Sequence, residues 1–167
     1  MDITPADATD APAIAAVYAH WVENSVVTFD VEAPSAADWR GRMRTAEEAG
    51  HPFLVGREDG RVVGYAAATA WKPKPAYRYT VENSVYLAPD ALGGGRGRAL
   101  LERLVVDCRD AGLHRIVALI ADGSAASGTL HASLGFRPVG RMEQVGWKHG
   151  RWVDVDVLEL ALDATGR

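Results

Sequence analysis

The sequence predicts a mixed α+β fold in a single domain that spans residues 1–167. Three observations support this class. Some segments carry apolar residues at helical spacing, whereas others carry the alternating or continuous apolar runs that are typical of strands. The segments follow one another as a strand and two helices, a run of antiparallel strands, and then helix, strand, helix and strand. No repeat, low-complexity stretch or linker divides the chain.

The N-terminal segments predict a short strand and two helices. Residues 1–4 form the strand, and Thr9 or Asp10 is placed to cap the first helix. Residues 26–35 predict a loop of extended character. The second helix starts at a capping box formed by Ser35 and Asp38, and it ends at Gly50. The apolar faces of the two helices are Ile14, Val17, Tyr18, Trp21 and Val22, and then Trp39, Met43 and Ala46.

The middle of the chain predicts antiparallel strands. Residues 51–71 have the pattern of a β-hairpin that turns at Asp59 and Gly60. Two prolines interrupt residues 72–79, which we expect to form a loop or an edge strand. Residues 80–88 are again typical of a strand.

The C-terminal segments alternate between helix and strand. A helix that closes near Gly112 is followed by a buried strand at 115–121 and a short helix at 125–134, with Gly135 at its end. The tail at 152–163 predicts a strand. Its apolar positions change phase between Val157 and Leu158, which predicts a bulge. The first of these helices has an apolar face of Leu101, Leu104, Val105 and Cys108.

Composition excludes several classes of protein. The net charge of −4 argues against a general binder of nucleic acid or of anionic membranes. The single cysteine, Cys108, excludes an intramolecular disulfide, and its place on an apolar helix face predicts burial. The histidines are scattered, and no apolar run is long enough to span a bilayer. The N-terminus, "MDITPADATD", is acidic and rich in small residues, which does not suit a signal peptide. We therefore expect a cytoplasmic protein without a metal site.

A cluster of glycines precedes the helix that ends near Gly112. Gly93, Gly94 and Gly95 are followed by Arg96, Gly97 and Arg98, a pattern typical of a backbone that approaches a phosphate group at a helix N-terminus. A P-loop would need a lysine and a hydroxyl residue after the glycines, and neither is present. A dinucleotide-binding loop fails on glycine spacing and on its distance from the strand. The remaining class of phosphate-binding loop is one in which a strand is followed by a Pro-Asp pair, a glycine loop and an amphipathic helix.

This arrangement resembles the pyrophosphate loop of the GCN5-related N-acetyltransferases, Arg/Gln-x-x-Gly-x-Gly/Ala, in which Gly95 and Gly97 match. Leu92 stands where the family has a basic or amide residue. We therefore expect the backbone N–H groups to hold the phosphate, with charge supplied by Arg96 and Arg98. The segments "AIAAVYAHWVENSVVTFD", "WKPKPAY", "TVENSVYLAPD", "LHASLGFRPVG" and "VGWKHGRWVDV" further resemble the phosphinothricin and methionine sulfoximine N-acetyltransferases of that superfamily, over nearly the whole chain.

The resemblance implies a central, mostly antiparallel twisted sheet flanked by helices, with splayed strands that hold acetyl-CoA as cosubstrate. It implies a homodimer that acts on a small-molecule amine. The catalytic residues that it implies are Glu82 as base and His131 as a second base or as the group that positions Glu82 and the amine. From the residues alone, Glu82 is also compatible with a solvent-facing position and His131 with a structural role.

The resemblance also implies binding residues. The thioester carbonyl is expected against backbone N–H groups of Val85, Tyr86 and Leu87. Ser127 matches a family serine, whereas Ser124 replaces an asparagine and offers fewer hydrogen bonds to coenzyme A. The cations at residues 72–78 favour capture of the carboxylate or phosphinate group of a small zwitterion beside the base, although this stretch is also compatible with a solvated turn. The expected substrate-binding residues are Phe29, Trp71, Lys72, Lys74, Tyr77, Arg78 and Asn83.

The predicted function is acetyl transfer to the α-amine of a small amino acid or analogue. A rival in the same superfamily acetylates another amine, such as a polyamine, an aminoglycoside or a protein N-terminus. A rival of another class is a non-catalytic acyl-CoA-binding module, which the departures at Leu92 and Ser124 favour and the presence of Glu82 and His131 disfavours.

Overall fold

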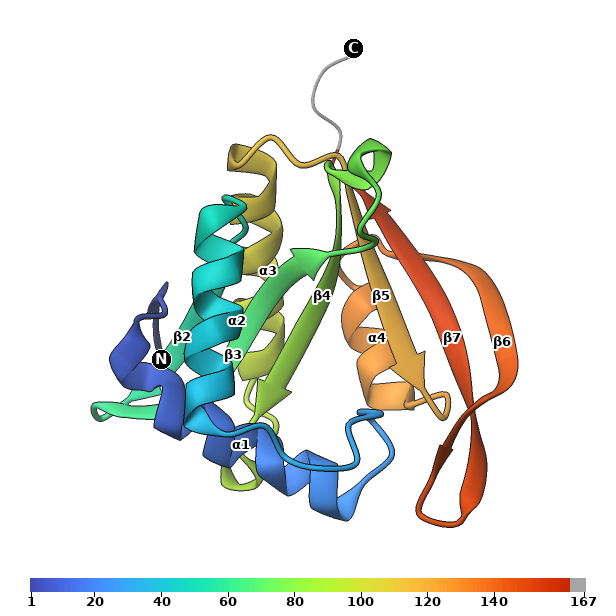
Figure 1. Cartoon of the computed structure of the whole chain (residues 1–167), viewed down its shortest axis with the longest axis horizontal. Coiled ribbons are helices and arrows are strands. Elements are labelled where there is room, and N and C mark those ends of the chain that lie inside the picture. Colours follow the sequence, from blue (N-terminus) through green and yellow to red (C-terminus); the bar gives the residue numbers. More distant parts are fainter. Residues whose placement is uncertain (163–167) are drawn as a thin grey trace.

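The computed structural model describes residues 1–162, and within them seven strands form one sheet in the order β1-β2-β3-β4-β5-β7-β6 (Figure 1). The strands are β1 (Asp2–Pro5), β2 (Phe53–Glu58), β3 (Arg61–Ala70), β4 (Thr80–Leu87), β5 (Arg115–Ala121), β6 (Arg137–Lys148) and β7 (Arg151–Ala161). The helices are α1 (Ala11–Asn24), α2 (Ala36–Glu48), α3 (Arg96–Asp110) and α4 (Ala125–Ala132). No helix in this part of the chain is long and apolar enough to cross a membrane.

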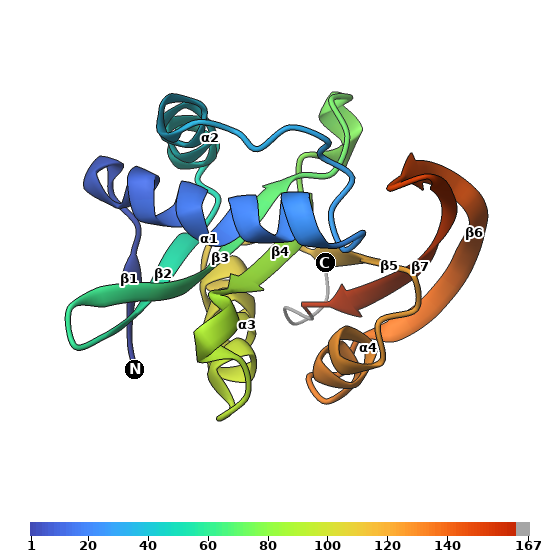
Figure 2. The same ribbon diagram turned by 90° about the horizontal axis from the view of Figure 1, so that it is seen from below.

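The sheet separates two layers of helices. Helices α1 and α2 cover one face, and α3 and α4 cover the other (Figure 2). Each face has its own apolar core, one built on Trp39 and Tyr65 and the other on Leu100, Leu104 and Ile116. All neighbouring strands run antiparallel except β4 and β5. The predicted mixed fold with a mostly antiparallel sheet is confirmed.

The helix predictions are confirmed, with one correction at the first cap. The second helix has the expected capping box, in which Ser35 and Asp38 exchange bonds. Asp10 occupies the N-cap position of the first helix, as predicted, but its side chain makes no capping bond to that helix. Its carboxylate pairs with Arg57, 2.6 Å away. A 3-10 turn (Ala8–Asp10) precedes the helix, and Asp7 caps that turn by accepting from the backbone N–H of Thr9. The last helix, α4, ends two residues earlier than predicted.

The hairpin of β2 and β3 turns at Asp59 and Gly60 as predicted, and residues 72–79 form a loop with a 3-10 turn (Pro75–Tyr77). Strand β6 was not predicted. Nearly all of its residues are exposed, so it lacks the apolar alternation that marks a half-buried strand. The hairpin that β6 forms with β7 turns at His149 and Gly150.

The bulge predicted inside the tail strand is wrong. Strand β7 pairs with β5 without a break across the change of phase, and the register shift lies on β6, between Pro138 and Gly140. Val153 packs with Val26 on one face of the sheet, whereas Leu158 and Leu162 belong to the core on the α3 face. The change of phase therefore marks a change in the covered face. Asp163, the last residue of the predicted tail, lies outside the described residues.

One glycine, on β3, tests how closely the strands pack, and a second, in helix α2, is its control. At Gly64 on β3, a Cβ atom would lie 2.7 Å from the backbone oxygen of Tyr86 and 2.5 Å from the Leu87 side chain. We expect Gly64→Ala to lower the free energy of unfolding by about 1–3 kcal/mol, because backbone cannot yield as a flexible side chain does. Gly41→Ala in α2 is the matched control. With nothing within 4 Å, it should stabilise the helix by about 0.5–1 kcal/mol. Denaturant unfolding measures both, and equal effects would contradict the packing described.

Candidate active site

A cavity of about 840 Å³ opens where β4 and β5 separate. The two strands are paired only from Thr80 to Glu82, against Arg115 to Val117, and beyond that point they diverge. The cavity is lined by α1, residues 27–29, β4, the glycine loop, β5 and α4. The splayed strands expected from the sequence resemblance are therefore present.

The peptide groups of β4 alternate between its two neighbours. Ala88 donates to Val63 and Thr80 accepts from Trp71, so the even-numbered peptide groups face β3. The odd-numbered groups of Asn83, Val85 and Leu87 face the gap that β5 leaves. Within the described residues, β4 has no strand partner on this side after Glu82. The N–H groups of Val85 and Leu87 thus point toward the cavity as predicted.

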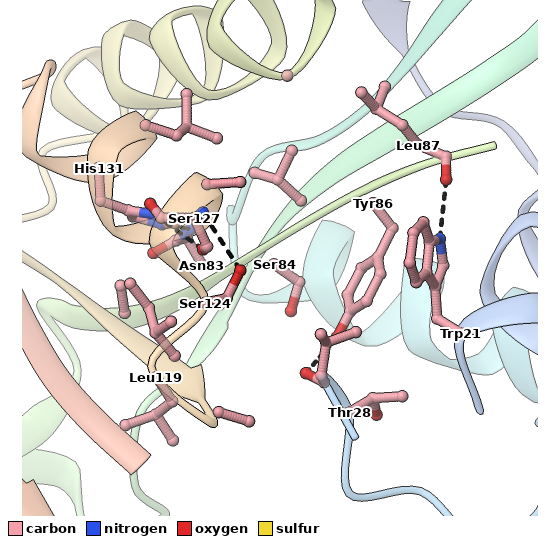
Figure 3. Close-up of a pocket in the computed structure, with 18 of the residues that line it drawn as sticks. Trp21, Thr28, Asn83, Ser84, Tyr86, Leu87, Leu119, Ser124, Ser127 and His131 are labelled. Carbon is pink, nitrogen blue, oxygen red and sulfur yellow. Dashed lines mark hydrogen bonds between the residues drawn. The ribbon is translucent and has the colours of Figure 1, made fainter. Parts of the chain in front are cut away.

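Tyr86 is a correction to that prediction. Its N–H faces β3, and it contributes its side chain to the cavity instead. The ring packs against Tyr18, and its hydroxyl donates to the backbone oxygen of Val27 at 3.5 Å. On the side of β4 that faces the gap, the indole N–H of Trp21 donates to the backbone oxygen of Leu87 at 2.8 Å (Figure 3).

Side chains of β4 alternate between the two faces of the sheet. Val81, Val85 and Leu87 pack into the core on the α3 face, whereas Tyr86 packs against the core on the α1 face. Glu82 and Ser84 share the face of Tyr86, and Asn83 shares the face of Val85. Both groups line the same cavity because the missing strand contact opens the sheet.

Glu82 lies on the α1 face, partly buried. Burial raises the pKa of its carboxyl group above the ordinary value, and the positive charge of Lys72 partly opposes that shift. A carboxylate with a raised pKa in a cavity is suited to take up a proton.

Asn83 and His131 meet on the α4 face (Figure 3). His131 Nδ1 lies 2.8 Å from the backbone oxygen of Ser127, which can only accept, so Nδ1 carries the proton. Nε2 therefore accepts from Asn83 Nδ2 at 3.0 Å. Burial lowers the pKa of His131, with the Ser127 hydrogen bond opposing, and this favours the neutral ring.

The expectation that His131 positions Glu82 is not supported by this geometry. His131 bonds to Asn83 and Ser127 on the α4 face, whereas Glu82 points to the α1 face, because adjacent residues of a strand point to opposite faces. Asn83, predicted to bind substrate, lines the cavity from the α4 face. The hydrogen bond from Asn83 also occupies the nitrogen with which the neutral ring of His131 would accept a proton. The prediction of a second base therefore has no support in this geometry.

The glycine loop places backbone N–H groups at the start of α3. Gly93, Gly94 and Gly95 all have positive φ, at 80°, 61° and 76°, which residues with a Cβ rarely adopt. Gly95 is the N-cap of α3, and no side chain caps the helix there. The Arg96 N–H donates to the Gly93 oxygen at 3.4 Å, and the N–H groups of Gly97 and Arg98 are the ones placed to bind an anion. Gly93, Gly95 and Gly97 line the cavity.

The two arginines of this loop have different roles. Arg96 forms a bidentate ion pair with Glu58, with nitrogen to oxygen distances of 2.8 and 3.0 Å, so its charge is already neutralised. Its guanidinium also fills the space beside Gly94. Among the described residues, Arg98 bonds only to oxygens of Ser133, which carry no net charge. Arg98 therefore keeps its full positive charge at the cavity, and the predicted contribution of Arg96 is not supported.

The cavity fits an extended ligand that has both a phosphate end and amide groups. Asn83 Oδ1 is buried and has no hydrogen-bond partner in residues 1–162, although a buried acceptor normally has one. Ser124 caps α4 by accepting from the Ser127 backbone N–H at 3.4 Å, and both serines line the cavity. The orphaned acceptor, the serine hydroxyls and the helix N-terminus provide polar groups along its length.

The predicted substrate residues are not all at the cavity. Phe29 lines it. The loop at 71–79 does not, and its cations are stacked on neighbouring rings, with Lys72 over Trp71 at 4.4 Å and Arg78 over Tyr79 at 4.4 Å. Lys74 and Tyr77 are exposed on the same loop. The charge of Lys72 nevertheless reaches Glu82.

Several cavity residues were missed from the sequence. Ser84 lies two residues from both Glu82 and Tyr86, so strand alternation alone places it on their face. In the sequence, Tyr18 and Trp21 have the spacing of ordinary core residues of a helix. The sequence predicts Leu119 as an ordinary apolar strand residue, yet it lines the cavity because β4 has separated from β5 at that point. Only Ser84 carried a signal that could have identified it.

Comparison with known proteins agrees with this geometry. The sequence profile of the acetyltransferase (GNAT) family matches residues 14–136. A phosphinothricin N-acetyltransferase from Alcaligenes faecalis is 42% identical over 93% of this chain and 79% of its own length. An L-methionine sulfoximine/L-methionine sulfone acetyltransferase from Salmonella typhimurium is 40% identical over 98% of this chain and 95% of its own.

A solved structure of an acetyltransferase from Salmonella typhimurium with its cofactor acetyl-CoA superposes with a TM-score of 0.96. The sequences are 39% identical, and the match covers 100% of this chain and 96% of that chain. The matched profile, the relatives and the splayed β4 and β5 agree, and the chain belongs to the acetyltransferase (GNAT) family.

Proposed function

We propose that this protein transfers the acetyl group of acetyl-CoA to the α-amine of a small amino acid or analogue of the phosphinothricin or methionine sulfoximine type. One observation carries the proposal. The cavity crosses the sheet, with the Glu82 carboxylate on the α1 face and the glycine loop heading α3 on the other. An amine and a phosphate-bearing acyl donor can thus approach from opposite faces. The names of the relatives support the substrate class.

Residues of the α3 and α4 side are proposed to hold acetyl-CoA, which supplies an activated acetyl group as a thioester. N–H groups of the glycine loop, together with Arg98, bind the pyrophosphate. Asn83 Oδ1, Ser124 and Ser127 offer hydrogen bonds to the arm of the cosubstrate. The N–H groups of Val85 and Leu87 orient the acetyl carbonyl, and such donors are worth about 2.7–4 kcal/mol each in other enzymes.

On the α1 face, Glu82 is proposed to take the proton from the amine as it attacks, directly or through a water molecule. Its buried position keeps the proton affinity of the carboxylate high. The side chains of Ser84, Tyr86 and Phe29 form the walls beside it. Since the substrate class carries an acidic group, Lys72 and the other cations of the loop at 71–79 are proposed to attract it to this mouth of the cavity.

We also propose a homodimer that works in the cytoplasm. The hairpin of β6 and β7 exposes a group of large apolar side chains, and exposed apolar patches of this kind mark interaction sites. They are Val139, Met142, Val145, Trp147 and Trp152. The buried thiol of Cys108 is compatible with a reducing compartment, and cell fractionation checks the location.

The base is tested by thiol release from acetyl-CoA with phosphinothricin, methionine sulfoximine, methionine sulfone and common amino acids as acceptors. Glu82→Gln should lower kcat by about 10²–10⁴-fold, because the amide cannot accept the proton. Binding of acetyl-CoA, measured by calorimetry, should be unchanged. Turnover of a polyamine or a peptide alone would instead favour the rival substrates, and binding without any turnover would favour a non-catalytic module.

The pH dependence of kcat has a defined sign. A protonated carboxyl group cannot act as base, so activity rises with pH as Glu82 ionises. Since burial raises the pKa of Glu82, the midpoint should lie above 4.5. Lys72→Met removes the opposing charge and should move the midpoint further upward. The amine titrates identically in both proteins, so a profile that does not move would argue against Glu82 as base.

The glycine loop is tested by comparing its two arginines. Arg98→Ala should raise the KM for acetyl-CoA by about 10-fold, since one charge-assisted contact to phosphate is lost. Arg96→Ala should change this KM less, and it should lower the melting temperature slightly through loss of the Glu58 pair. Steady-state kinetics and thermal unfolding measure the two effects. The reverse ranking of KM values would contradict the assignment.

The dimer is tested by sedimentation velocity. The wild type should sediment as a dimer, and Trp147→Ser should shift it toward monomer, because Trp147 is more than half exposed within a single chain. Exposed Leu92→Ser, at the glycine loop, is the control and should leave the association unchanged. A monomeric wild type at micromolar concentration would overturn the proposal.

A further inference from the structure

Residues 25–30, here called the wall loop, follow α1 and form one side of the cavity through Val27, Thr28 and Phe29. One edge of the loop is fastened to the body of the protein. The Tyr18 hydroxyl forms hydrogen bonds with the Thr28 hydroxyl and with Asp30, the latter at 2.9 Å. Tyr86 donates to the backbone oxygen of Val27. Since Tyr86 shares the face of Glu82, the wall loop belongs to the amine side of the cavity.

The other edge of the wall loop is fastened to the β6–β7 hairpin, more than a hundred residues away in sequence. Lys148 Nζ donates to the backbone oxygen of Thr28 at 2.8 Å. The ring of Phe29 lies against Gly146, where a Cβ atom would come within 2.3 Å of it. Val26 packs with Ala121 and Val153. The hairpin thus closes the side of the cavity that the separation of β4 and β5 leaves open.

Lys148 is unusual among these contacts. Its side chain is only 4% exposed, and lysine is almost never fully buried unless it is paired. No ion pair with a carboxylate is formed by Lys148 among the described residues, where its bonded partner is the Thr28 carbonyl. Burial lowers the pKa of the ammonium group, and the negative charge of Asp30 opposes this. An apolar side chain of similar length would pack there without that desolvation cost.

We propose that Lys148 is a positioning residue for the amine site. It ties the wall loop to the hairpin, and this sets the distance at which Thr28 and Phe29 face Glu82 across the cavity. Lys148 acts through Phe29 and does not line the cavity itself. The fastening is a property of the fold alone, whereas its effect on amine binding rests on the proposed function.

Lys148→Met is the primary test, because methionine keeps the length and removes the charge. Hydrogen exchange followed by mass spectrometry should show faster exchange in the peptide that covers residues 25–30. The KM for the amine should rise about 10-fold, as expected when one hydrogen bond from a charged group is lost. The KM for acetyl-CoA should stay within about twofold, because the glycine loop and its helix are untouched. The melting temperature should stay the same or rise, since a buried charge is removed.

Two further variants complete the test, the first as a control and the second as an independent change at the same contact. Arg137→Met removes a positive charge from the same strand, where Arg137 pairs with Glu159 away from the wall loop, and it should leave exchange and both KM values unchanged. Gly146→Ala moves Phe29 while Lys148 stays in place, and it should raise the KM for the amine alone. If Lys148→Met does not fold, the same exchange and KM measurements on Gly146→Ala decide whether the β6–β7 hairpin keeps the wall loop in position.

The outcomes separate the two proposals. Unchanged exchange at residues 25–30 in Lys148→Met would overturn the fastening. Faster exchange with an unchanged KM for the amine would overturn the positioning role and leave a purely structural lysine. If the wild type turns over no amine at all, the proposed function fails, and the exchange experiment still decides whether Lys148 holds the wall loop.

Discussion

The early end of the β4–β5 pairing is the constraint on which the functional geometry depends. The two strands share three residue pairs and then part, so the following peptide groups of β4 lose their ladder partners. Backbone polar groups away from water require partners. The indole of Trp21 satisfies the Leu87 carbonyl, and the N–H groups of Val85 and Leu87 are left facing a cavity that a ligand can enter. The site thus lies where the sheet lacks the contact between β4 and β5.

Strand alternation then divides the chemistry between two faces. Glu82 and Tyr86 point toward α1, whereas Asn83 points toward α4 and holds His131 in one tautomer. A single strand therefore presents a proton acceptor to one side and a neutral hydrogen-bonded pair to the other. The cavity joins the two sides, and this supports the proposal that one gap receives two different reactants.

Ion pairing decides which cationic side chains near the site keep an uncompensated charge. Arg96 and Arg98 stand two residues apart in the sequence, but Glu58 on β2 neutralises the first and leaves the second at the cavity. Lys72 acts on Glu82 through space, from a loop outside the cavity. Lys148 is buried, and its ammonium group donates a hydrogen bond to the backbone carbonyl of Thr28. Residues of the same charge are thus proposed to serve as ligand contact, structural ion pair or positioning group according to their neighbours.

The sequence by itself determined the local features. Helical and strand periodicity, the capping box at Ser35, the turn at Asp59 and the glycine loop are all encoded within a few residues, and a family resemblance supplied the topology and Glu82. Tertiary structure alone decided the rest. The exposure of β6, the two covered faces of β7, the partner of Arg96 and the separation of Glu82 from His131 depend on segments far apart in the chain. Such contacts leave no periodic pattern, because each is set by which surfaces meet when the sheet closes.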